Sequence, residues 1–192
     1  AAHMDEIGFM VKFVDDKGFL RLQPLGGSDP RQLFAQRVIV HAGRGMKRLT
    51  GVLSYTTKPT HMLSPEEAKE SPVIDKFFVD LGLPADEVKK IVVIGDMVTM
   101  DRETIFTGDV VVSKAIDNRV GLFVMLKALE LVQTDAIDLY AVATVQEEVG
   151  LRGATTSAYA INPEVGIALD TTLANDFPGI TDFDSVTRLG EG

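Results

Sequence analysis

The most restrictive feature of this sequence is an apolar run that ends in two adjacent carboxylates. Residues 139–145 are almost entirely apolar, and Glu147, Glu148 and Gly150 follow them. Such a run predicts a buried strand of a mostly parallel sheet, because strands of that kind are covered on both faces. Open α/β sheets place their chemistry just beyond the carboxyl ends of the strands, so the two acids suggest a site. Taken alone, a solvated acidic loop is the simpler explanation of the pair.

Two further junctions of strand and helix each supply a carboxylate. Asp117 follows a short predicted strand at 110–112 and begins a helix that is expected to reach about Gln133. This helix is apolar over most of its circumference, which predicts that it is buried. Asp170 ends another predicted strand, 165–169. Three separate helix caps would explain these acids one by one, but their recurrence at one edge of a sheet favours a shared site.

The first residues add a histidine to this group of acids. His3 and Asp5 are two positions apart, so on an extended strand their side chains share a face. One of them can bind a metal while the other accepts the second ring N–H and fixes the tautomer. A surface pair, or residues left from cloning, would account for so short a motif as simply.

Together these residues match the needs of a hydrolytic centre with two metal ions. One carboxylate bridges ions roughly 3.5–4 Å apart, others complete the coordination, and a free carboxylate takes a proton from the attacking water. A glutamate next to a ligand is well placed for the last task. The sequence has no cysteine, so any metal would use imidazole nitrogen and carboxylate oxygen, which suit zinc, cobalt or manganese.

The region from residue 8 to about residue 101 has a different pattern. Short apolar runs separated by Gly-rich turns predict a small β-barrel or sandwich. Strands are expected at 9–14, 19–25, 37–41, 49–55 and 91–94, residues 77–81 are ambiguous, and helical turns are expected after Ser64 and at 84–90. Of the two remaining histidines, His41 fits a structural position in a strand, whereas His61 in its loop is harder to assign.

Composition excludes several classes of protein. The formal net charge of −9 argues against binding to nucleic acid or to anionic membrane surfaces. No apolar run is long enough to span a bilayer, and the first residues lack the pattern of a signal peptide. The absence of cysteine is compatible with a reducing compartment, and we expect a cytoplasmic protein.

Four motifs, in order along the whole chain, resemble the glutamyl aminopeptidase and tetrahedral aminopeptidase family. The motifs are the segments 3–8 (HMDEIG), 114–121 (KAIDNRVG), 146–154 (QEEVGLRGA) and 168–170 (ALD). Members of this family are cytoplasmic di-metal peptidases, some of which have been labelled endoglucanases. The resemblance implies a three-layer α/β/α catalytic domain, residues 1–7 and 102–192, with an inserted β-rich domain at 8–101. Through the inserted domain, subunits would pair and assemble into large homo-oligomers, commonly dodecamers.

The resemblance also implies roles for individual residues. Two divalent ions, zinc or cobalt, would be held by four ligands in this chain: His3, Asp117, Glu148 and Asp170. Asp117 would bridge the ions, Asp170 and His3 would complete the first, and Glu148 would bind the second. Asp5 would orient His3 from behind, and Glu147 would be the general base in the hydrolysis of peptide substrates. A non-proline cis peptide is expected between Asp117 and Asn118.

The sequence departs from the family in two ways. The family has further catalytic domain before the motif of His3 and Asp5, and a histidine ligand of the second ion that lies beyond residue 192. We therefore expect the chain to be an internal piece of a longer enzyme. On its own it should hold at most one well-occupied metal site and have no useful peptidase activity.

Two other functions stay open at this point. A glycoside hydrolase could use Glu147 or Glu148 together with Asp117 or Asp170 as its carboxylate pair, although His3 and Asp5 would then have no role. The chain also has no tryptophan for a sugar platform. Alternatively, the β-rich region is the working part and the chain is a non-catalytic assembly module.

Overall fold

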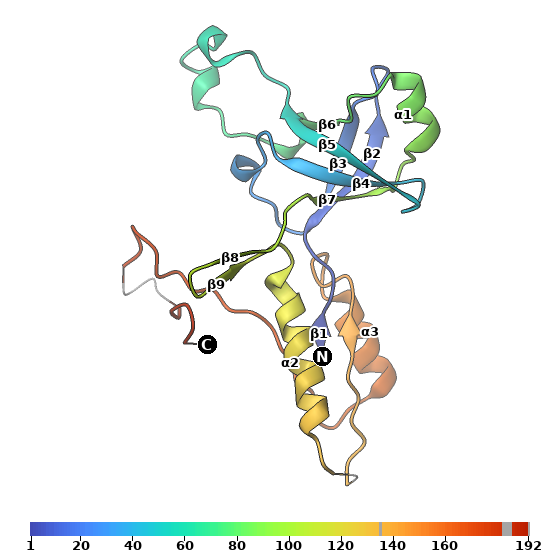
Figure 1. The fold of residues 1–192 in the computed structure, drawn as a ribbon, viewed down its shortest axis with the longest axis vertical. Coiled ribbons are helices and arrows are strands. Elements are labelled where there is room, and N and C mark those ends of the chain that lie inside the picture. Colours follow the sequence, from blue (N-terminus) through green and yellow to red (C-terminus); the bar gives the residue numbers. More distant parts are fainter. Residues whose placement is uncertain (135, 182–185, 192) are drawn as a thin grey trace. The chain divides into compact units, whose positions relative to one another are not determined.

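The structure is a computed structural model that describes residues 1–134, 136–181 and 186–191. It divides into two compact units. One unit comprises Ala1–Asp5 and Ala115–Gly192, and the other comprises Glu6–Lys114 (Figure 1). The second unit is thus an insertion in the sequence of the first. The sequence predicts a catalytic domain at 1–7 and 102–192 and an inserted domain at 8–101. These functional domain bounds stay a prediction.

Six strands of the inserted unit form a closed antiparallel barrel, as the sequence predicts. They are β2 (Gly8–Val14), β3 (Leu20–Leu25), β4 (Arg37–Ala42), β5 (Lys47–Tyr55), β6 (Phe77–Asp80) and β7 (Met97–Met100). Around the barrel their order is β2-β3-β6-β5-β4-β7 (Figure 1). Alternate residues fill the interior, among them Phe9, Val11, Val38 and Val40, each at most 1% exposed.

One expected strand of this unit is wrong. Residues 91–94 are not a strand: α1 (Ala85–Ile91) ends there, and the strand that closes the barrel is β7. The apolar run turns because Asp96 bonds back to it. The Val93 N–H donates to Asp96 Oδ2 at 2.9 Å, and the Asp96 N–H donates to the Val93 carbonyl at 3.1 Å. The apolar pattern of residues 91–94 could not predict that the Asp96 side chain would accept the Val93 N–H and so form a turn.

Asp96 is a buried carboxylate, 2% exposed, that accepts three backbone N–H groups. Besides Val93, the donors are Gly43 at 3.0 Å and Arg44 at 2.8 Å, so this one side chain ties the β4–β5 turn to the segment before β7.

We predict that Asp96→Ala destabilises the protein strongly, because three buried N–H groups lose their acceptor. The expected loss in the free energy of unfolding is about 2–4 kcal/mol, measured by urea denaturation. Asp75→Ala is the control, since Asp75 is 85% exposed and its ion pair with Lys12 is long, 3.8 Å; exposed pairs of this kind contribute little. A similar, small change for both variants would contradict the prediction.

Four short 3₁₀ turns connect the strands of this unit. They are η1 (Pro30–Gln32), η2 (Thr60–Met62), η3 (Glu67–Lys69) and η4 (Ile74–Lys76). The helix expected after Ser64 is the single turn η3, and Ser64 and Glu67 form a capping box before it. The Ser64 N–H donates to Glu67 Oε2 at 2.8 Å, and the Glu67 N–H donates to Ser64 Oγ at 3.1 Å.

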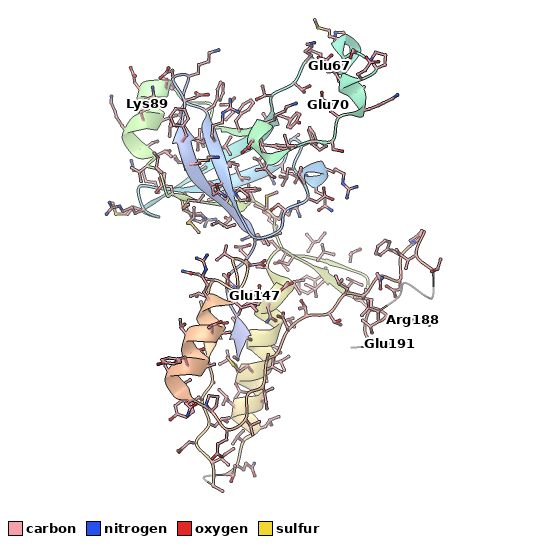
Figure 2. All side chains as sticks on the ribbon, turned by 180° about the vertical axis from the view of Figure 1, so that it is seen from behind. Glu67, Glu70, Lys89, Glu147, Arg188 and Glu191 are labelled. Carbon is pink, nitrogen blue, oxygen red and sulfur yellow. The ribbon has the colours of Figure 1, made fainter. Side chains whose placement is uncertain are left out.

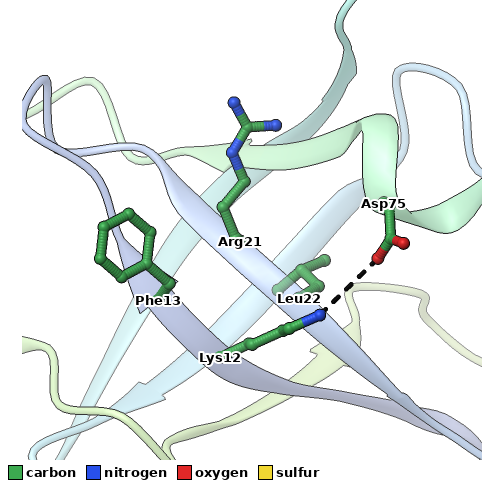
Figure 3. Close-up of a pocket in the computed structure, with 5 residues that line it drawn as sticks. All are labelled: Lys12, Phe13, Arg21, Leu22 and Asp75. Atoms are coloured by element: carbon green, nitrogen blue, oxygen red, sulfur yellow. Dashed lines mark ion pairs between the residues drawn. The ribbon is translucent and has the colours of Figure 1, made fainter.

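A hollow lies on the outside of the barrel where β2 is irregular. The pairing of β2 with β3 shifts between Val11 and Phe13, and Lys12 and Phe13 are both exposed, as a bulge produces. With Arg21, Leu22 and Asp75 they line the hollow (Figure 3).

The inserted unit also contains a separate hairpin, β8 (Ile105–Thr107) with β9 (Val110–Val112). At the two ends of the inserted unit, Lys114 Nζ donates to Glu6 Oε1 at 2.6 Å. The chain therefore enters and leaves the inserted unit at adjacent points.

The described part of the first unit contains a two-stranded parallel pair and two helices. β1 (Ala2–His3) pairs with β10 (Ala143–Thr144), α2 spans Ile116–Leu131 and α3 spans Arg152–Ile161. The strands expected at 139–145 and 165–169 are therefore much shorter than predicted or absent. β1 supplies just two residues, so the ladder extends only over the residues opposite them. Residues 167–169 still lie beside β1, since the Ala1 amino group donates to the Ile167 carbonyl and the Leu169 N–H donates to the Ala1 carbonyl.

The expectation that the long helix is buried is also wrong. In α2 the buried residues are Asn118, Gly121 and Met125, whereas Phe123, Leu126 and Leu131 are more than half exposed. The helix packs against β1. In the described part of this unit, one apolar side of the helix is covered in this way, and its other apolar side chains stay exposed. Among the described residues, no helix is both long enough and apolar enough to cross a membrane.

Candidate functional site

The backbone of the first unit brings three segment ends to one place. The Ala2 N–H donates to the Val142 carbonyl at 3.1 Å, the Met4 N–H donates to the Thr144 carbonyl at 2.9 Å, and Leu169 bonds to Ala1 on the other side of β1. Because the three segments run parallel, the residues just beyond them are neighbours. Asp5, Glu147, Glu148 and Asp170 follow these segments, so their predicted meeting at one edge is observed.

The expectation that Asp117 follows a strand of the same sheet is wrong, because the strand 110–112 is β9 in the separate antiparallel hairpin. Asp117 reaches the site from the start of α2, which packs against β1.

His3 lies at the centre of the cluster. Its Nε2 atom is 2.9 Å from Asp117 Oδ1, 3.8 Å from Glu147 Oε2 and 3.9 Å from Asp170 Oδ1. The imidazole is 3% exposed, whereas the side chain of Asp117 is 63% exposed. The histidine is therefore buried, whereas the Asp117 carboxylate beside it stays open to a ligand.

The start of α2 has an unusual backbone that presents Asp117. The peptide between Asp117 and Asn118 is cis, as predicted, and Ala115 has a φ of 57°. Asn118 is fully buried; its Nδ2 donates to the Leu169 carbonyl at 2.8 Å, and its Oδ1 accepts the Gly121 N–H at 3.1 Å. Asn118, the residue after Asp117, is thus hydrogen-bonded to Leu169, the residue before Asp170.

Asn118 and Arg119 were not singled out from the sequence. Arg119 Nε donates to the Met4 carbonyl at 2.7 Å, which connects α2 to the segment between His3 and Asp5. The available signal was their position directly after Asp117. Gly121 belongs to the same arrangement, because a Cβ atom there would overlap the Asn118 amide.

The acidic turn begins with a reversal at Gln146, whose φ is 60°. The Arg152 N–H donates to the Gln146 carbonyl at 3.1 Å, and the Gly153 N–H donates to the Val145 carbonyl at 3.0 Å. A Cβ atom at position 153 would overlap the Val145 backbone, so glycine allows α3 to start against the strand end. This close approach holds Glu147 and Glu148 next to β1 (Glu147 is labelled in Figure 2).

The surrounding charges shift two pKa values in this cluster. Burial acts against protonation of His3, but the hydrogen bond with Asp117 and the charges of Glu147, Asp117 and Asp170 together raise the pKa of its imidazole above the ordinary value. Burial, and then the charges of Glu147 and Asp117, raise the pKa of Glu148. Such an excess of carboxylates around one histidine favours a cation.

The side chains form two sets of potential metal ligands that share His3. One set is His3, Asp117 and Asp170, and the other is His3, Glu147 and Glu148; within each set the ligand atoms lie within 4.8 Å of one another. The remaining histidines take no part in either set. His41 belongs to β4, where its Nε2 lies 3.0 Å from Thr99 Oγ1, and His61 lies in η2.

Comparison with known proteins connects this geometry to a family. A family model described as M42 glutamyl aminopeptidase matches residues 1–192, the whole chain. The chain belongs to this family. The family resemblance drawn from the four sequence motifs is thus confirmed.

Individual M42 relatives extend the comparison. The chain is 39% identical to FrvX of Escherichia coli over 193 residues, 99% of this chain and 53% of that protein. It is 35% identical to the glutamyl aminopeptidase of Lactococcus lactis over 201 residues, all of this chain and 54% of that protein. The chain therefore spans about half the length of these relatives.

Solved structures of M42 relatives share the fold. Aminopeptidase APDkam598 from the archaeon Desulfurococcus kamchatkensis matches with a TM-score of 0.90 and 46% identity over 100% of this chain and 52% of its own. The TET1 peptidase of Pyrococcus horikoshii matches with a TM-score of 0.70 and 30% identity over 92% of this chain and 55% of its own. The expected fold class, an α/β peptidase domain with a small inserted β-barrel, is confirmed.

Proposed function

We propose that the full-length protein is a metal-dependent aminopeptidase that removes N-terminal residues from peptides by activating water at two metal ions. The observation that carries this proposal is the set of His3, Asp117 and Asp170, whose ligand atoms lie within 4.8 Å of one another, with Glu147 and Glu148 beside the same buried histidine. Membership of the M42 family, and a relative named for glutamyl aminopeptidase activity, support the class of reaction.

The side chains offer three ligands for one zinc or cobalt ion and part of a ligand set for a second. Imidazole and carboxylate groups suit these metals, and three protein ligands are the usual number for catalytic zinc. His3, Asp117 and Asp170 would hold the first ion, and Glu148 would hold the second together with Asp117. The buried Nδ1 atom of His3 has no hydrogen-bond partner among the described residues, and it lies 3.5 Å from Asp5 Oδ1. With Nε2 as the ligand atom, Nδ1 carries the proton and Asp5 stabilises that tautomer.

In this proposal Glu147 moves the proton. Bound metal ions would supply Lewis acidity toward water and toward the scissile carbonyl. The Glu147 carboxylate accepts a proton from the attacking water as the carbon–oxygen bond forms, and it then delivers that proton to the leaving amine nitrogen. Glu147 lies 3.8 Å from His3 Nε2, close enough to the ligands to meet water at the same centre.

The assembly and the location of the protein belong to the same proposal. The relative from Pyrococcus horikoshii is described as assembling into a tetrahedron or a large octahedral shell. We infer a homo-oligomer built from dimers, dodecamers included, whose subunits pair through the inserted unit, in the cytoplasm.

The test is cleavage of aminoacyl substrates by the full-length protein loaded with zinc or cobalt. A peptide with a free α-amino group should be shortened from its N-terminus, whereas the same peptide with an acetylated terminus should remain intact. Mass spectrometry distinguishes the products. Cleavage of both peptides would indicate an endopeptidase, and hydrolysis of a glucan alone would support the glycoside hydrolase instead.

A further inference from the structure

Asp5 makes its closest contacts with the backbone of the acidic turn. Its Oδ1 atom accepts the Glu147 N–H at 3.2 Å, and its Oδ2 atom accepts the Glu148 N–H at 3.2 Å. The two partners lie more than 140 positions away in the sequence, so these contacts exist only in the folded unit. Hydrogen bonds to an ionised carboxylate are among the stronger ones in proteins.

The other hydrogen bonds of this turn are accepted by its backbone carbonyl groups, whereas the two amides donate to Asp5. The Gln146 carbonyl accepts the Arg152 N–H, and the Glu147 carbonyl accepts the N–H groups of Gly150 and Leu151 at 2.9 and 3.0 Å. These bonds secure the downstream side of the turn to α3. On the upstream side, the Glu147 and Glu148 amides donate to Asp5.

The contact of Asp5 with His3 is weaker by comparison. The distance from His3 Nδ1 to Asp5 Oδ1 is 3.5 Å, and within the part of the chain that the structure describes the buried Nδ1 makes no hydrogen bond. A carboxylate whose two oxygens each accept a backbone amide is restricted in how far it can turn toward the ring.

We propose that Asp5 is a positioning residue that fixes the backbone of Glu147 and Glu148, and so aims the general base and its neighbouring ligand together. This inference deepens the proposed function and rests on it for its kinetic consequence. The effect of Asp5 on catalysis then passes through the acidic turn, in addition to any effect on the tautomer of His3. Misplacement of a reacting group by ~1 Å costs on the order of 10²-fold in rate, so a loosened turn has a large effect.

The structural part is tested on the metal-free, full-length protein by hydrogen exchange with residue-level mass spectrometry. Asp5→Ala should accelerate exchange of the Glu147 and Glu148 amides by about 10- to 100-fold, the range expected for bonds to a charged acceptor. Asp5→Asn keeps one acceptor oxygen, so it should release one of the two amides, and it serves if the alanine variant does not fold. The amide of Thr155 in α3, bonded to the Leu151 carbonyl, should not change.

Asp15→Ala is the matched control. Asp15 Oδ1 also accepts two backbone amides, those of Lys17 and Phe19 at 2.9 and 3.0 Å, but in the turn between β2 and β3. This variant should accelerate exchange in its own turn and leave the 147 and 148 amides and the catalytic activity unchanged.

The kinetic part uses a double-mutant cycle at saturating metal. Asp5→Asn alone should lower kcat by about 10²-fold with KM changed less than about threefold. In a Glu147→Gln background the same change should cost less than about threefold, because the residue it aims is already disabled.

Unchanged exchange of both amides in both Asp5 variants would overturn the proposal. It would also be overturned if the losses in kcat of the Asp5 and Glu147 variants multiplied fully in the double variant, because Asp5 would then act through His3 alone. If the exchange result holds but the wild-type protein cleaves no peptide, the proposed function fails and the structural role of Asp5 stands.

Discussion

Glu147→Gln is expected to lower kcat for aminoacyl substrates by ~10²–10⁴-fold, the usual contribution of a positioned general base. Glutamine has nearly the same shape as glutamate but cannot accept the proton of the attacking water. Metal content should stay nearly unchanged, because in the proposal Glu147 is not a ligand. Steady-state kinetics and elemental analysis of the full-length variant measure both quantities.

Glu148→Gln provides the comparison for this prediction. It should lose metal from the second site, since an amide oxygen is a poorer ligand than a carboxylate. If the Glu147 variant loses metal and the Glu148 variant keeps it, the two roles are exchanged. The structure makes this a sharp comparison, because both side chains lie with His3 in one set of potential ligands.

Removal of metal should abolish peptidase activity, with a loss of at least about 10³-fold, since Lewis-acid stabilisation contributes several kcal/mol. The protein is treated with a chelator, freed of the chelator, and assayed with its metal content verified. Zinc or cobalt should restore turnover. Magnesium should not, because it prefers six oxygen ligands and dehydrates reluctantly.

The same experiment separates the alternatives. A glycoside hydrolase that uses a carboxylate pair would keep its activity without metal. Full peptidase activity in the metal-free protein would exclude the two-metal mechanism. A binding study by calorimetry on the 192-residue chain adds a further comparison, since one tight zinc site is expected there and two would mean that another ligand completes the second ion.

Much of the barrel could be predicted from the sequence, because short apolar runs there are separated by clear turns. The failure at residues 91–94 has a specific cause. The run is as apolar as a strand, but Asp96 binds the Val93 amide and converts it into a turn. A bond between a side chain and the backbone leaves no trace in hydrophobic periodicity.

The residues of the candidate site could be predicted from the sequence, whereas the strand lengths and hydrogen bonds that position them could not. The carboxylates after residues 145 and 169 could be placed beside His3 because parallel strands align their ends. Asp117 was placed there for a wrong reason, since the strand before it pairs antiparallel with β8 in a separate hairpin. The lengths of the strands 139–145 and 165–169 were overestimated, since a strand extends only as far as its partner. Asn118 and Arg119 escaped notice because their roles depend on distant carbonyl groups, those of Leu169 and Met4.

The ion pair between Glu6 and Lys114, 2.6 Å long, has a consequence for how this architecture can vary. A unit whose entry and exit lie this close can be lengthened, exchanged or excised while the flanking chain needs only a short bridge. The proposed metal ligands and the proposed general base all belong to the flanking sequence, before Glu6 or after Lys114. The inserted barrel can therefore change during evolution without a change in any of the residues proposed for the chemistry.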